Sequence, residues 1–254
     1  MSEGIPPPPH REGGAIAAKV QDGQAPSPPA TWKAIEAFPV YGIALVGAFI
    51  LGLPLFWIPQ SSGWFFVVAL MAGQVSLAAS VLAWVRFVNR GPLAALGRLR
   101  LLDVGVGVVG GLALYLVSLI WGALVLMITS LLGHDLSIPE QIPDAVRGSS
   151  GVVAAVATVL GAPVSEELFF RGFLYKGLRR RFRMWPAALI SSLPFALVHG
   201  AYGSLSQGAI LVLALFPVGV GLALVYEHRQ SLMAAISAHA LFNAVGFTLI
   251  MLGR

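Results

Sequence analysis

Seven long apolar runs alternate with short polar segments along most of this chain. Most runs are about 18 to 25 residues long, enough to cross a hydrocarbon layer of ~30 Å as a helix. With proline, glycine and charged residues taken as the breaks between them, the runs cover residues 39–58, 64–85, 103–132, 151–176, 186–202, 207–226 and 231–252. The fifth run is short, and the third is long enough to tilt or to continue past the bilayer. The pattern predicts an all-α, multi-pass membrane bundle of about seven transmembrane helices.

The first 38 residues have a different character. Proline recurs from Pro6 to Pro9 and again at Pro26, Pro28 and Pro29, among glycine, serine, glutamine and charges. Such a segment has too few apolar residues to form a core. It is expected to be a disordered or polyproline-like tail over residues 1–38.

Composition agrees with a membrane protein and excludes several classes. Hydrophobic residues make up 57% of the 254 residues and charged residues only 11%, whereas a soluble domain carries about 25% charged residues. The net charge is +5, but the basic residues lie beside apolar runs, as membrane topology and anionic lipid require, so no nucleic-acid partner is expected. The absence of cysteine excludes a thiol nucleophile and a thiolate metal site.

The distribution of basic residues predicts the orientation. Cytoplasmic loops carry the excess of lysine and arginine. Three alternate loops, after the second, fourth and sixth runs, hold ten such residues: Arg86, Arg90, Arg98, Arg100, Lys176, Arg179, Arg180, Arg181, Arg183 and Arg229. The opposite side has only Arg147 and Arg254. We therefore expect a protein of the cell membrane with a cytoplasmic N-terminus and an external C-terminus.

Ionisable and amide side chains inside the C-terminal runs are the clearest functional signal. An ionisable side chain at the centre of a bilayer costs at least ~2.5 to 3.5 kcal/mol, so it indicates a function by default. The fourth, fifth and seventh runs carry six such residues: Glu166, Glu167, Arg171, His199, His239 and Asn243. At ~1.5 Å per residue, Glu166, His199 and His239 lie roughly 15, 20 and 14 Å from the basic side. Three helices are thus expected to bring polar groups to a similar depth.

Helical spacing predicts which of these side chains meet. Glu167 and Arg171 are four residues apart and can pair along one face. Glu166 is rotated by about 100° from Glu167, which leaves it for chemistry, with His199 as its expected neighbour. Two structural interpretations stay open, because a Glu–Arg pair can be a self-neutralising salt bridge and a membrane histidine or asparagine often bonds to a neighbouring helix.

Together these residues form three motifs that resemble the CPBP family, also called Abi or CAAX-type intramembrane proteases, which includes the eukaryotic CAAX prenyl endopeptidase. The motifs are EExxxR (Glu166, Glu167, Arg171), FxxxH (Phe195, His199) and HxxxN (His239, Asn243). The resemblance covers roughly residues 151–250. It divides the chain into the tail, accessory transmembrane helices over 39–132 and a CPBP-type catalytic membrane core over 133–254.

The resemblance implies an endopeptidase that hydrolyses a peptide bond of a membrane-associated substrate. Glu166 and His199 would activate a water molecule, and His239 with Asn243 would stabilise the oxyanion. Glu167, Arg171 and Phe195 would orient them. A metal-free, glutamate-type mechanism is favoured, because the sequence has no HExxH helix. Zinc remains an alternative cofactor, with Glu166, His199 and His239 as its ligands.

Two other classes of function remain open. Buried glutamate, histidine and arginine also build proton relays, so a proton- or ion-coupled transporter is an alternative, although no inverted repeat relates the two halves. A non-catalytic membrane scaffold or immunity protein is a third. The sequence does not identify the substrate or say whether it is prenylated.

Overall fold

The computed structural model describes residues 27–133, 137–139, 142–200 and 204–253. In this part of the chain all regular structure is helical, and strand-like pairing is limited to an isolated bridge between Arg98 and Ser231. Six helical segments are long and apolar enough to cross a membrane, and a seventh is shorter. The predicted all-α, multi-pass fold is therefore confirmed.

Each of the seven predicted runs corresponds to one helical segment. The main helices are α1 (Ala37–Leu51), α2 (Gly63–Ala83), α3 (Asp103–Leu131), α7 (Met184–His199), α8 (Leu205–Arg229) and α9 (Leu232–Leu252). The remaining segment, residues 151–179, is a continuous helix made of α4 (Gly151–Val156), α5 (Ala162–Glu167), α6 (Lys176–Arg179) and two π-helical stretches. We call it the central helix. In the first run α1 ends early, and a 3-10 helix, Leu53–Trp57, follows it. The fifth run was predicted to reach residue 202; α7 ends at His199, and residues 201 and 202 lie outside the described part.

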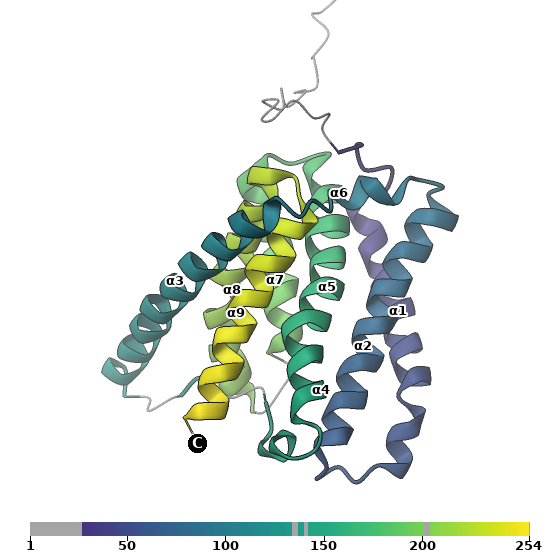
Figure 1. Cartoon of the computed structure of the whole chain (residues 1–254). Coiled ribbons are helices and arrows are strands. Elements are labelled where there is room, and N and C mark those ends of the chain that lie inside the picture. Colours follow the sequence, from purple (N-terminus) through teal and green to yellow (C-terminus); the bar gives the residue numbers. More distant parts are fainter. Residues whose placement is uncertain (1–26, 134–136, 140–141, 201–203, 254) are drawn as a thin grey trace, which may run out of the picture.

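The central helix lies between two groups of helices (Figure 1). The α1–α2 hairpin flanks it on one side, and α7, α8 and α9 flank it on the other, with α3 outermost against α8 and α9. Aromatic side chains from the second half of the central helix, Phe169, Phe170 and Phe173, meet Phe195 of α7 and Leu222 of α8 in the main apolar core. The large apolar side chains on the outer faces, such as Phe49, Val109 and Leu193, are exposed, as expected of surfaces that face lipid.

The loops that carry most of the basic residues meet at one end of the bundle. The backbone amide of Arg98 donates to the Gln230 carbonyl, and the Arg98 carbonyl accepts from Met233. Arg179 of α6 forms an ion pair with Glu227 of α8 at 2.8 Å, and Arg229 pairs with Asp103 at 2.9 Å. We call this the basic end; the described chain ends at the opposite one (Figure 1).

The structure describes only part of the predicted tail of residues 1–38. Residues 1–26 lie outside the described part, whereas residues 27–38 include buried side chains at the basic end, among them Ala30 and Trp32. Trp32 is fully buried, stacks on Phe173 at 5.0 Å between ring centroids, and donates from Nε1 to the Phe173 carbonyl at 2.7 Å. Glu36 accepts hydrogen bonds from the side chains of Trp84 and Asn89. The proline-rich composition did not predict this packing, because composition does not report the burial of a single indole side chain.

Candidate functional site

The central helix departs from α-helical geometry on both sides of the glutamate pair. π-helical stretches run over Ala157–Gly161 and Leu168–Tyr175, and α5 between them ends at Glu167. Single π turns inside α-helices are rare and occur frequently at functional sites. The first stretch, which we call the π turn, immediately precedes Pro163.

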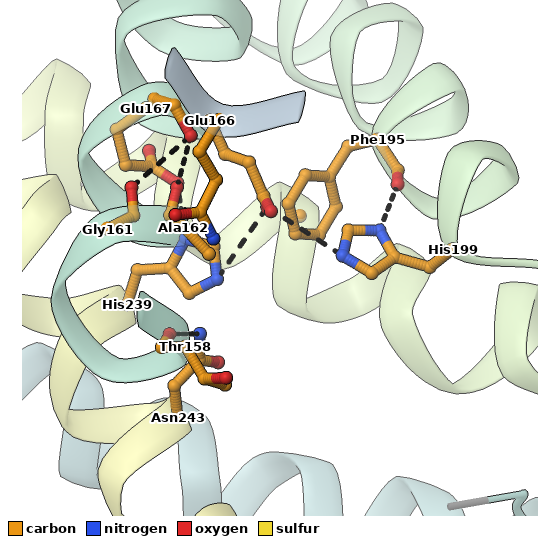
Figure 2. A network of polar contacts seen from close by, with 12 residues as sticks. Thr158, Gly161, Ala162, Glu166, Glu167, Phe195, His199, His239 and Asn243 are labelled. Carbon is orange, nitrogen blue, oxygen red and sulfur yellow. Dashed lines mark hydrogen bonds and ion pairs between the residues drawn. The ribbon is translucent and has the colours of Figure 1, made fainter. Parts of the chain in front are cut away.

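Pro163 leaves a carbonyl of the π turn without a backbone donor. The amide of Ala162 donates five residues back, to the Ala157 carbonyl. In the same register the Thr158 carbonyl would accept from residue 163, but proline has no N–H. Asn243 of α9 supplies the missing donor, since its Nδ2 lies 2.9 Å from the Thr158 oxygen (Figure 2). An unpaired carbonyl is costly in a bilayer, so Asn243 has a structural role here that its motif did not predict.

Glu167, Arg171 and His239 form a buried polar network. Arg171 Nη1 lies 2.8 Å from Glu167 Oε1, so the predicted pair is present, and both side chains are at most 1% exposed. The same carboxylate oxygen accepts from His239 Nδ1 at 2.8 Å. Arg171 Nη2 donates to the Gly219 carbonyl of α8 at 2.9 Å. The network therefore joins the central helix to α8 and α9 and fixes the direction of the His239 ring.

Glu166 forms no bond to Glu167 or Arg171 and points toward two histidine rings, those of His199 and His239. Its Oε2 lies 3.7 Å from His199 Nε2 and 3.9 Å from His239 Nε2 (Figure 2). Both distances exceed a hydrogen bond, and this buried oxygen has no hydrogen-bond partner among the described residues. The side chains of Glu166 and His199 are 18% and 20% exposed, against 5% for His239. The carboxylate and His199 are thus the more accessible part of the site.

The tautomer of each histidine follows from its second nitrogen. His199 Nδ1 lies 2.8 Å from the Phe195 carbonyl, and His239 Nδ1 bonds to the Glu167 carboxylate. Both partners only accept, so each Nδ1 carries a proton. In the neutral rings, Nε2 of both histidines therefore turns a lone pair toward Glu166.

Phe195 packs against the two histidines and the arginine of the site. Its ring lies 4.9 Å from the ring of His199 and 5.8 Å from that of His239, and the Arg171 guanidinium sits 4.5 Å from its centroid. A guanidinium over an aromatic face is a favourable cation–π contact, which gains strength when water is excluded. Phe195 thus contacts both histidine rings and covers the buried arginine.

The structure brings six of the seven predicted residues into one contact network: Glu166, Glu167, Arg171, Phe195, His199 and His239. Asn243 lies beside them on α9 and is directed to Thr158 (Figure 2). Sequence reasoning missed Thr158, Pro163 and Gly219. A Cβ at Gly219 would lie 2.9 Å from Cβ of Ser192. Glycine therefore lets α7 and α8 approach closely at the residue whose carbonyl accepts from Arg171. The proline three residues before Glu166 was a readable signal of an irregular helix.

The donor atoms suit zinc in type, because one carboxylate oxygen and two imidazole nitrogens converge on one region. Among the described residues, however, no group of three histidine, aspartate or glutamate side chains is spaced to hold a metal ion. The spacing seen here thus differs from that of a formed metal site.

Comparisons with known proteins point to the same part of the chain. The family model described as "Type II CAAX prenyl endopeptidase Rce1-like" matches residues 148–245. A curated relative, an uncharacterized 24.3 kDa protein of Escherichia coli, is 32% identical over 137 residues, which cover 51% of this chain and 56% of the relative. The chain thus spans little more than half the length of that relative. No solved structure matches. Residues 148–245, which contain all three motifs, thus match the model of the Rce1-like type II CAAX prenyl endopeptidases, in agreement with the resemblance that the motifs indicated.

Proposed function

We propose that this protein is a CAAX-type intramembrane endopeptidase, in which Glu166 and His199 activate water to hydrolyse a peptide bond of a membrane-associated substrate. The observation that carries the proposal is the placement of Glu166: a buried carboxylate oxygen that accepts no hydrogen bond from the described residues, 3.7 Å from His199 Nε2 and 3.9 Å from His239 Nε2. The family match over residues 148–245 supports the same class of reaction.

The protonation pattern of Glu166 and His199 favours a water molecule that contacts both side chains. The carboxylate accepts hydrogen bonds, and so does Nε2 of a His199 ring whose proton lies on Nδ1. A molecule that bridges two acceptors must donate two hydrogens, as water does. Glu166 then takes one proton as the water oxygen attacks the substrate carbonyl, and returns it to the leaving amine.

We assign to His239 the stabilisation of the oxyanion that forms in this attack. Its Nδ1 is held by Glu167, and when the ring is protonated on both nitrogens, Nε2–H is a donor beside Glu166. We assign a supporting donor role to Asn243, which uses one amide hydrogen on Thr158 and retains a second. A donor aimed at a developing oxyanion contributes about 10²- to 10³-fold to the rate.

We propose that the reaction needs no metal. In the alternative, Glu166, His199 and His239 would hold a zinc ion, which would polarise the substrate carbonyl and acidify water. The protonation pattern supports the metal-free assignment. A bridging water would donate one hydrogen to Glu166 and one to His199, so both acceptors would be satisfied without a metal ion.

We also propose that the protein resides in the cell membrane with its basic end in the cytoplasm. The support is the gathering at that end of the loops that carry ten of the lysines and arginines. On this placement the N-terminus is cytoplasmic, the C-terminus is external, and the partners are lipid and a membrane-associated peptide, without nucleic acid.

Purified protein in lipid tests the proposal with membrane-embedded peptide substrates. Glu166→Gln keeps the side-chain volume and removes the base, so hydrolysis should fall by at least ~10²-fold, while Asp144→Asn, a change in an exposed carboxylate, should leave it unaltered. Loss of the His239 side chain should lower kcat more than it raises KM.

Exhaustive chelation separates the two mechanisms, because metal-free hydrolysis survives it. Zinc bound one-to-one, with activity lost on chelation and restored by zinc, would overturn the metal-free assignment only. Unaltered hydrolysis by Glu166→Gln would overturn the peptidase mechanism. Proton-coupled flux without hydrolysis would favour a transporter.

A further inference from the structure

The π turn before the glutamates accepts two side-chain hydrogen bonds. One comes from inside the region matched by the family model, and the other comes from outside it. Asn243 of α9 donates to the Thr158 carbonyl, as described above. From the opposite side, Gln74 of α2 donates from Nε2 to the Ala157 carbonyl at 3.1 Å. That carbonyl already accepts from Ala162, so the Gln74 amide supports the i−5 bond that defines the turn.

Gln74 also fits closely against the end of the π turn. A Cβ built at Gly161 would lie 2.4 Å from Gln74 Oε1 and 3.3 Å from Cδ. Any side chain at position 161 would therefore displace the Gln74 amide. Glycine at this position lets the amide of α2 reach the backbone of the central helix.

The π turn sets the direction of both carboxylates. It inserts one residue relative to an α-helix, and one residue corresponds to a rotation of ~100° about the helix axis. Glu166 lies five residues after Gly161 on the same helix, whereas His199 and His239 lie on other helices. A return of the turn to α-helical register would rotate Glu166 away from the two imidazoles.

We propose that Gln74 is a positioning residue of the site: by holding the π turn open, it aims Glu166 at His199 and His239. The expected effect on kcat rests on the proposed peptidase function, whereas the expected effect on the direction of Glu166 rests on geometry alone. It gives α2, which lies outside the region matched by the family model, a defined part in the reaction.

Gln74→Met tests the proposal, because methionine keeps the length of the side chain and loses the donor. Ser76→Ala is the matched control. Ser76 also lies on α2 and also donates a buried hydrogen bond, at 2.7 Å, but to Ala44 of α1 instead of the central helix. A purely structural effect would be similar in both variants. We expect Gln74→Met to lower kcat by about 10- to 100-fold, as for groups that orient catalytic residues, with KM little changed, and Ser76→Ala to stay near wild type.

Gly161→Ala provides an independent route to the same defect. It should lower kcat to a similar extent by displacing the amide, and the Gly161→Ala/Gln74→Met double variant should be no worse than either single variant. Additive losses would show that the two positions act separately and would overturn the proposal.

Crosslinking reports the positioning without any activity. The chain has no cysteine, so Glu166→Cys/His199→Cys introduces a unique pair, whose linkage by a short bifunctional thiol reagent depends on how the central helix faces α7. Crosslinking should slow when Gln74→Met is added and stay unaltered when Ser76→Ala is added. Slower crosslinking with Gln74→Met alone would support the positioning role even if the wild-type protein hydrolysed no peptide. Such a lack of hydrolysis would refute only the proposed function. Equal crosslinking in both backgrounds would overturn the positioning role.

Discussion

Two substitutions five residues apart in the central helix should differ greatly in their effect on stability. Arg171→Met keeps most of the side-chain length but leaves the fully buried Glu167 carboxylate without its cation and the Gly219 carbonyl without its donor. Removal of one partner from a buried ion pair costs about 3 to 5 kcal/mol. The lost cation–π contact with Phe195 contributes up to ~2 kcal/mol. These contributions overlap, so we expect a total near the upper part of the first range.

Glu166→Gln should be far milder, because Glu166 Oε2 accepts no hydrogen bond from the described residues and the side chain is 18% exposed. We expect a change within ~1 kcal/mol. Folded yield and thermal unfolding in detergent would be measured for both variants. The double variant Arg171→Met/Glu167→Gln should recover part of the loss, since no charge is then left unpaired.

Equal unfolding temperatures for Arg171→Met and Glu166→Gln would refute the reasoning, because the buried pair would then carry no special cost. If the double variant were no more stable than Arg171→Met, the loss would come from packing of the arginine side chain and not from the unpaired carboxylate.

Two further predictions concern α9 and the topology. Asn243→Ala should destabilise the protein by about 1 to 3 kcal/mol, the cost of an unsatisfied buried carbonyl, and thermal unfolding should show a smaller loss in a Pro163→Ala background, where residue 163 regains an N–H that can reach Thr158; an equal loss in both backgrounds would contradict the orphaned-carbonyl account. Reporter fusions after Arg100 and Arg183 should give a cytoplasmic signal and a fusion after Arg254 an external one, and a cytoplasmic signal at Arg254 would reverse the proposed orientation.

Much of the fold could be predicted, because local properties determine it. Long apolar runs in a membrane protein form helices, and each of the seven predicted runs did so, including the shorter fifth run. The pairing of Glu167 with Arg171 is equally local, since it depends only on the spacing of four residues. The convergence of Glu166 with His199 and His239 could be predicted from the axial rise per residue along antiparallel helices. This calculation needs no knowledge of how the helices pack.

The parts that escaped prediction depend on contacts between distant segments. Asn243 was assigned by its motif to the oxyanion, but its partner in the structure is a carbonyl that Pro163 leaves unsatisfied on another helix. The composition of the tail predicted disorder up to residue 38, yet Trp32 bonds to Phe173, 141 residues later. No periodicity along the chain reports a contact of that separation.

The anchoring of residues 27–36 has a consequence for how the protein is made. This segment leaves the ribosome before any of the long helical segments, but the carbonyl that Trp32 binds belongs to Phe173, on the fourth of the seven. Arg180, which donates to the Trp32 carbonyl at 2.6 Å, is made later still. The segment therefore docks only after the central helix has been synthesised and inserted, and a chain interrupted before that point keeps an unsheltered tryptophan near its start. Docking of this segment thus marks insertion of the helix that holds the glutamates, before α7, α8 and α9 have been made.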